Sequence, residues 1–148
     1  MTAELNSKAK ASLGKFTRRQ VMELDTCAHC ALCTENCPAY HESRDPLHAP
    51  GVRSAVAVKL YDKKHNLLTR LFGNTEVTEE DVERLSESAY HCTLCGRCME
   101  SCPFGFQTHE LWCRVREIVA DLGGTPQKRR QAREDARRNH EPLRPGAR

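Results

Sequence analysis

Apolar residues recur with the period of an α-helix between residues 78 and 89. Thr78 is a candidate N-cap, and Asp81 stands three residues later, which is the spacing of a capping box. The apolar residues that follow lie on one face of the expected helix: Val82, Leu85 and Ala89. This stretch is therefore predicted to form an amphipathic helix.

A second helix is predicted from residue 108 onward. Thr108 is its candidate N-cap, and the pair Gly123-Gly124, followed by Pro126, marks its end. Its apolar side carries five residues at helical spacing: Leu111, Val115, Ile118, Val119 and Leu122. Weaker helical signals cover residues 17–24, 52–61 and 67–72, and no stretch alternates with period two as a strand would. The pattern therefore predicts a mainly α fold.

The chain is poor in the residues that usually build a core. Leu, Ile, Val and Phe number 27 of 148, or 18%. A strongly charged chain with less than ~20% of these residues is expected to stay disordered. The net charge is only +3, so disorder of the whole chain is not implied. Another source of stability is expected, and the nine cysteines are the candidates, because metal ligation supplies folding free energy.

Charge divides the chain unevenly. Residues 1–122 carry a net charge of −2 and residues 123–148 a net charge of +5. We therefore divide the chain into an N-terminal extension (1–16), a helical domain (17–122) and a basic, flexible tail (123–148). The tail is interpreted as solvated, or as a contact for an acidic partner surface. It lacks interleaved aromatic residues, so no nucleic-acid partner is expected.

The sequence carries no sign of export or of membrane insertion. The longest purely apolar stretch is residues 55–58, far short of the ~18 residues that span a bilayer. Residues 1–10 are polar and contain no apolar core of a secretory signal. We therefore expect a cytoplasmic protein whose cysteines do not form a disulfide framework.

A cysteine motif occurs twice in the chain. The spacing C-x2-C-x2-C-x3-C followed by proline is met first by Cys27, Cys30, Cys33, Cys37 and Pro38. It returns 65 residues later as Cys92, Cys95, Cys98, Cys102 and Pro103. We call these the first and the second motif.

The motif spacing predicts two iron–sulfur clusters. The first three thiolates of such a run converge on one site, and in the bacterial ferredoxin pattern the fourth ligates the other cluster. Cluster 1, a [4Fe–4S] cluster, is then held by Cys27, Cys30, Cys33 and Cys102. Cluster 2, also [4Fe–4S], is held by Cys92, Cys95, Cys98 and Cys37. Structural zinc is the competing interpretation, but zinc sites typically use two separated C-x2–4-C pairs.

Residues around the motifs have lesser expected roles. Gly96 leaves room for backbone N–H groups near sulfur, whereas Ala31 stands at the equivalent place in the first motif, so the two cluster potentials are expected to differ. His29 and His91 are expected to be surface residues or neighbours of the clusters. Cys113, the ninth cysteine, is expected to be a small buried side chain, with a redox or interface thiol as the alternative.

No motif for substrate chemistry accompanies the cysteines. The chain has no G-x-G-x-x-G, no Walker loop and no G-x-S-x-G. We assign no catalytic residue and expect an electron relay that is not catalytic alone. A zinc- or cluster-based redox sensor is a further alternative, although eight ligands exceed what a sensor needs.

The residues of both motifs, with Asp45-Pro46, the stretch 49–53 and the stretch 90–98, resemble the C-type subunits of heterodisulfide reductase. The resemblance covers about residues 17–122 and implies an α-helical ferredoxin fold. The same pattern forms the N-terminal iron–sulfur part of the related D-type subunits. The two cysteine motifs are the strongest part of this resemblance.

The resemblance implies an electron-transfer component of an oxidoreductase complex in sulfur metabolism. Such components pass electrons between an A-type subunit, which contains flavin and iron–sulfur clusters, and a catalytic B-type subunit, which handles a disulfide or sulfur compound. Bacterial complexes of this kind are associated with sulfur oxidation, and archaeal ones reduce the coenzyme M–coenzyme B heterodisulfide. The alternative is the iron–sulfur component of a quinone-linked dehydrogenase of the succinate or glycerol-3-phosphate type. The succinate type has an additional N-terminal [2Fe–2S] domain, for which we expect no room before Cys27.

Overall fold

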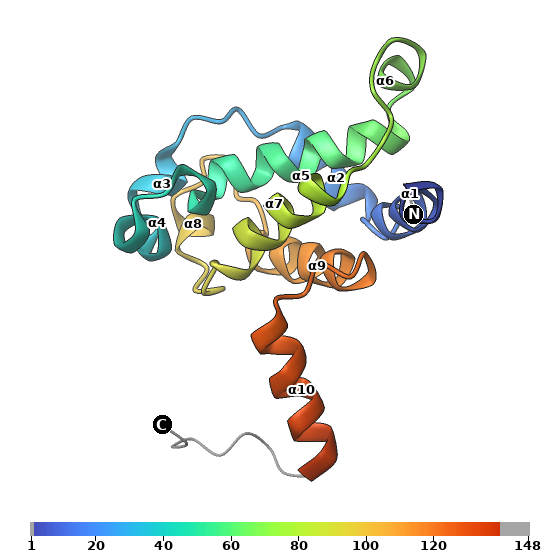
Figure 1. Ribbon diagram of the computed structural model, residues 1–148. Coiled ribbons are helices and arrows are strands. Elements are labelled where there is room, and N and C mark those ends of the chain that lie inside the picture. The colour runs from blue at the N-terminus through green and yellow to red at the C-terminus, as the bar shows by residue number, and fades with distance from the viewer. Residues whose placement is uncertain (1, 140–148) are drawn as a thin grey trace.

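The computed structural model describes residues 2–139, which contain helices and no β-strand (Figure 1). In chain order the elements are α1 (Thr2–Leu13), α2 (Arg18–Asp25), α3 (Leu32–Glu35), α4 (Pro38–Ser43), the 3₁₀ helix η1 (Pro46–His48), α5 (Pro50–His65), α6 (Leu67–Phe72), α7 (Glu79–Tyr90), α8 (Arg97–Glu100), α9 (Thr108–Asp121) and α10 (Gln127–Asn139). The prediction of a mainly α fold is confirmed for these residues.

Capping boxes begin two of the predicted helices. The side chains of Thr17 and Thr78 each accept a hydrogen bond from the backbone N–H three residues later, at the starts of α2 and α7. Gln20 and Asp81 accept hydrogen bonds from the N–H groups of these caps in return. The predicted helix at 67–72 coincides with α6, whereas α5 extends beyond the predicted range 52–61 at both ends.

Helix α9 begins where predicted but is capped differently. Gln107 occupies the N-cap position, and no side chain caps the helix there. The Thr108 hydroxyl instead lies 3.1 Å from the sulfur of Cys98, so this residue serves the cysteine region rather than the helix end. Gly123, in the left-handed conformation with φ 79°, follows the helix as the sequence predicts.

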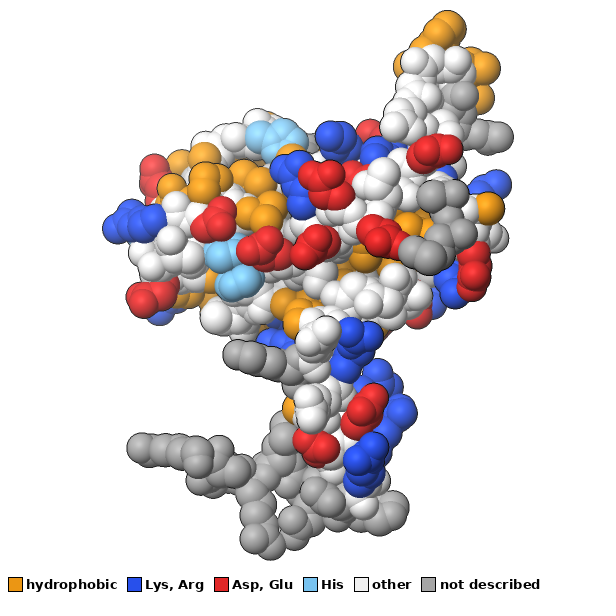
Figure 2. Space-filling model, viewed as in Figure 1, with side chains coloured by type: hydrophobic (Ala, Val, Ile, Leu, Met, Phe, Trp, Pro, Cys, Tyr) orange, Lys and Arg blue, Asp and Glu red, His pale blue; other side chains and the backbone are white. Residues whose placement is uncertain are grey.

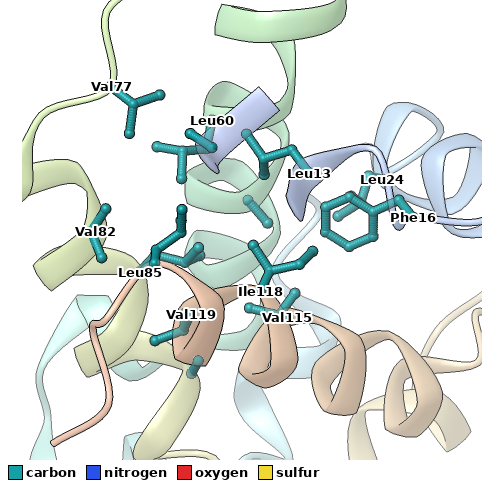
Figure 3. Close-up of a cluster of buried hydrophobic side chains, with 14 of the residues drawn as sticks. Leu13, Phe16, Leu24, Leu60, Val77, Val82, Leu85, Val115, Ile118 and Val119 are labelled. Carbon is teal, nitrogen blue, oxygen red and sulfur yellow. The ribbon is translucent and has the colours of Figure 1, made fainter. Parts of the chain in front are cut away.

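The hydrophobic core lies between the longer helices. Helix α5 packs against α1, α2 and α7, and α9 packs against α7 and α1. The side chains between them form one cluster, seen in Figure 3, that includes Leu13, Phe16, Leu24, Leu60, Val82, Leu85, Val115, Ile118 and Val119. The buried large aliphatic residues of these helices therefore form one continuous core.

Helix α1 is part of this packing. Ala9, Leu13 and Phe16 are buried, although on sequence grounds residues 1–16 are only an extension. The Asn6 side chain also accepts a hydrogen bond of 2.9 Å from the N–H of Val77, which joins α1 to the segment before α7. The helical period of α1 is hard to see in the sequence because most of its apolar side chains are the small ones of alanine.

Two elements project from the body. The segment 123–148 is expected to be a flexible tail, but residues 127–139 form α10, which points away from the other helices (Figure 1). Arg, Gln and Ala favour helix, and Arg129 stacks over the Tyr90 ring at 5.0 Å. The rest of the expected tail, 140–148, lies outside the described residues.

Helix α6 carries exposed apolar side chains, visible at its tip in Figure 2: Leu67, Leu68, Leu71 and Phe72.

Removing one capping hydroxyl tests the origin of α7. Thr78→Ala leaves the N–H of Asp81 without its side-chain acceptor, so we expect a loss of about 1 kcal/mol in the free energy of unfolding. Thermal unfolding of anaerobically purified protein, compared with a Thr125→Ala control in the turn after α9, measures this loss. Equal stability of the two variants would contradict a role for the cap.

Candidate metal centres

The two motif loops follow the same backbone path. Two residues after its first cysteine, each loop has a residue with positive φ, His29 at 49° and Leu94 at 57°. The residue after each second cysteine is also left-handed, Ala31 at 65° and Gly96 at 78°. A one-turn helix, α3 or α8, follows in each case. Left-handed residues turn successive N–H groups toward one concavity, an arrangement that holds anionic groups and iron–sulfur sites.

The two loops contact each other through equivalent residues. Helices α3 and α8 pack together, and each stands at the same place in its motif. The Asn36 amide donates a 2.7 Å hydrogen bond to the hydroxyl of Ser101, and these residues directly precede the fourth cysteines of the two motifs. The two loops therefore meet through equivalent positions, close to the fourth cysteine of each motif.

The eight motif cysteines line two cavities. The first is lined by Cys27, Cys30, Cys33, Cys98 and Cys102. The second is lined by Cys37, Cys92, Cys95 and Cys98. The structure thus brings Cys102 to the first loop and Cys37 to the second. All nine cysteines are free, and thiolates are the donors that hold iron–sulfur clusters, so the residues fit two such groups.

The cavities share a wall. Four residues line both of them: Pro50, Cys98, Thr108 and Trp112. Trp112 is buried with 2% of its surface exposed, and Cys98 with 8%. The two sites are therefore neighbours, separated by packed side chains rather than by solvent.

Each cavity also has a cysteine near the surface. Cys37 and Cys98 are buried, whereas Cys30 and Cys95, the middle cysteines of the two loops, are exposed. A group held in either cavity is accordingly enclosed on its inner side and close to solvent on its outer side. Figure 1 places the loops beside α3, α4 and α8, at the end of the molecule away from α6.

Burial and hydrogen bonding shift the pKa values of the cysteine thiols in opposite directions. Burial raises the pKa of Cys92 and of Cys33, because the thiolate is poorly solvated there. The pKa of Cys95 is lowered, mainly by a hydrogen bond from the backbone N–H of Arg97. In the buried positions, bound iron would therefore supply the stabilisation that a thiolate needs.

A buried arginine adjoins the second cavity. Arg53 has 1% of its surface exposed, and its guanidinium donates to the carbonyls of Ser88 (2.7 Å) and His48 (2.9 Å). No carboxylate lies within ion-pair distance of it in the described part of the chain. Its charge opposes the rise that burial causes in the pKa of Cys92. Arg53 belongs to the stretch that carries the family resemblance, yet its sequence position alone does not indicate a charge inside the protein.

The remaining candidates lie outside the cavity walls, except His29. His29 lines the first cavity, and its Nδ1 is 3.8 Å from the Cys27 sulfur. His91 is exposed and stacks on His48. Cys113 lines neither cysteine cavity and is only partly buried, so the expectation of a buried side chain is wrong. It faces an open surface hollow between α2 and α9.

No helix in the range 2–139 combines the length and the apolar character needed to cross a bilayer. Residues 23–106 match the family model described as 4Fe-4S dicluster domain. No solved structure matches this chain.

Among curated proteins, the chain is 34% identical over 112 residues to the D-type subunit of the dihydromethanophenazine:CoB–CoM heterodisulfide reductase of Methanosarcina acetivorans, and the match covers 75% of this chain and 27% of the relative. It is 29% identical to the Hdr-like menaquinol oxidoreductase iron-sulfur subunit 2 of Archaeoglobus fulgidus, over 68% of this chain and 19% of the relative. It is 28% identical to the EtfAB:quinone oxidoreductase of Syntrophomonas wolfei, over 86% of this chain and 21% of the relative. The chain thus spans between a fifth and about a quarter of these relatives.

Proposed function

Because the chain belongs to the 4Fe-4S dicluster domain family and carries two [4Fe–4S] clusters, we propose that it is the relay component of a heterodisulfide-reductase-like complex. Its role is to pass electrons between an A-type subunit, with flavin and iron–sulfur clusters, and a catalytic B-type subunit that handles a disulfide or a sulfur compound. We assign it to the C-type subunits and to the cytoplasm, and we expect no catalysis by the chain alone.

The ligands are proposed to be shared between the two motifs. Cluster 1 is held by the three leading cysteines of the first motif and by Cys102, and cluster 2 by those of the second motif and by Cys37. The cavity walls support this allotment, because Cys102 lines the first cavity and Cys37 the second. Cys98 lines both, and we assign it to cluster 2 because its own loop supplies the other two leading ligands.

The proposal of an electron relay rests mainly on the wall that the two cavities share. Bound in these cavities, the clusters supply one-electron transfer. Trp112 and Thr108 form the wall between the two sites and keep water out, which favours exchange between neighbours over loss to solvent. Cys30 and Cys95 are exposed on the outer sides of the two cavities. Each cluster therefore has its own exposed side, at which one of the two partner subunits can exchange electrons with it.

A quinone-linked complex is the second candidate. It is favoured by the printed names of relatives that are menaquinol and quinone oxidoreductases. In that case the chain would deliver electrons to or from a partner that reacts with quinone, while its own residues would play the same part. The two candidates differ in the partners and not in the cysteine sites.

Metal analysis followed by partner capture tests the proposal. Anaerobically purified protein should contain about eight iron and eight sulfide per chain and give the EPR spectrum of two interacting reduced clusters after dithionite. Expressed in its native host, it should co-purify with the A-type and B-type subunits, and the isolated chain should accept electrons but leave disulfides unreduced. Zinc without sulfide would overturn the relay. A quinone-reactive partner in place of the B-type one would select the second candidate.

A further inference from the structure

Three potential metal ligands meet at the end of α7, outside both cysteine cavities. One ligand atom from each of His48, Glu87 and His91 lies within 4.8 Å of the other two. Glu87 and His91 are four residues apart, so their side chains leave the same face of the helix end. His48 comes from η1, and its ring lies 3.7 Å from that of His91, centroid to centroid. Figure 2 shows histidine and acidic side chains adjoining in this region.

The hydrogen bonds of both imidazoles leave the same nitrogen available. The Ser43 hydroxyl donates to the carbonyl of Ala39, so it can only accept from Nδ1 of His48, at 2.7 Å. Nδ1 of His91 lies 2.8 Å from the carbonyl of Glu87, which also can only accept. These contacts favour the tautomer with the proton on Nδ1, in which Nε2 presents a lone pair.

The Nε2 atom of His48 is buried and has no hydrogen-bond partner. Only 5% of the His48 surface is exposed, so this atom is shielded from bulk solvent. The His91 ring and the Glu87 carboxylate complete the cluster, each with a potential ligand atom within 4.8 Å of those of the others. A cation placed among them would be attracted to the carboxylate and would give the unpartnered nitrogen of His48 a partner.

The scaffold that holds His48 is fixed before any ion binds. The Ser88 hydroxyl donates a 2.6 Å hydrogen bond to the carbonyl of Leu47, and Arg53 donates to the carbonyl of His48. These contacts hold η1 against α7. Glu87 and His91 are exposed, so their side chains have room to rotate from the stacked arrangement toward a common ion.

We propose that Nε2 of His48, Nε2 of His91 and the Glu87 carboxylate bind a divalent transition-metal ion of the zinc type, with water as the fourth ligand. Imidazole and carboxylate are ligands that zinc accepts, and an Nδ1–H bond to a carbonyl or hydroxyl is the usual support of a zinc-bound histidine. The ion ties η1 to the residue that precedes Cys92, so it braces the start of the second motif. This site does not depend on the proposed electron transfer.

Zinc binding by the cluster-loaded protein is the test. Anaerobically purified protein is dialysed against buffered Zn²⁺, and bound zinc and iron are measured together. We expect one zinc per chain in addition to unchanged iron. His91→Ala and Glu87→Gln should each weaken zinc binding at least tenfold. Ser43→Ala, which removes the hydroxyl that orients His48, should weaken it roughly 10–100-fold.

Two exposed residues of the same kinds serve as controls. Glu83→Gln, one turn earlier on α7, and His41→Ala, on α4 and outside both cysteine cavities, should bind zinc as the wild-type chain does. Absence of bound zinc in the wild-type protein, or equal binding by all variants, would overturn the proposal. Iron that falls as zinc rises would also overturn it, because the zinc would then occupy the cysteine cavities. Unchanged iron in every variant shows that the clusters remain.

Discussion

Replacing Cys102 with alanine is expected to halve the iron content, from about eight to about four atoms per chain. Cys102 lines the cavity of the first loop, where we assign it as the fourth ligand of cluster 1. Without a fourth thiolate this cluster is lost, while cluster 2 keeps all of its ligands. The interaction between two reduced clusters should disappear from the EPR spectrum and leave that of one isolated cluster.

Double variants decide which loop Cys102 serves. If ligation is shared between the motifs, adding Cys27→Ala to Cys102→Ala removes no further iron, because both residues belong to the same cluster. Adding Cys92→Ala should remove the remaining iron. Ligation of each cluster within its own motif predicts the reverse order, and that result would contradict the proposed allotment. Cys113→Ala, which alters the one cysteine outside both cavities, should keep about eight iron atoms.

Replacing Arg53 with methionine should lower the reduction potential of cluster 2. The reduced cluster carries one more negative charge, and the buried guanidinium stabilises it. At an effective dielectric constant of about 20, a unit charge within about 10 Å contributes on the order of 1–2 kcal/mol. For one electron this corresponds to a shift of roughly 40–90 mV toward negative potential. A redox titration followed by EPR should show this shift in one cluster and a smaller one in the other.

Two further variants separate charge from structure. Arg53→Lys keeps the charge while it loses part of the hydrogen bonding to Ser88 and His48, so its potentials should stay near the wild-type values. Arg84→Gln removes an exposed arginine from α7 and should leave both potentials unchanged. A folded Arg53→Met protein with full iron content and unshifted potentials would contradict an electrostatic role for Arg53.

The local rules of helix formation made several parts of the fold predictable. Thr17 and Thr78 start α2 and α7 because a short polar side chain and its partner three residues later suffice to begin a helix. Thr108 has a similar signal, but tertiary packing directs its hydroxyl to Cys98 instead. A sequence pattern reports what a side chain can do locally, and it contains no information about a competing neighbour ten residues away.

The cysteines were predictable because cluster ligation imposes a fixed spacing on the chain. The surroundings of these cysteines were not predictable in the same way. Arg53 and Trp112 come from α5 and α9, and only the packing of these helices brings them to the cavities. Helix α1 is not visible as a core element in the sequence for a related reason, because Ala9 is a weak apolar signal there but fits closely against other helices.

Each cavity is lined by cysteines from both motif loops, and this affects how the protein matures in the cell. The first cavity needs residues near 27–33 and Cys102, and the second needs Cys37 and residues near 92–98. During synthesis neither cavity has its full set of cysteines until the second loop has left the ribosome, after which both are completed within a few residues. With the proposed ligands, a nascent chain that stalls before Cys92 offers three of the four cysteines of cluster 1 but only one of the four of cluster 2, so we expect both clusters to be inserted only after the second loop is made.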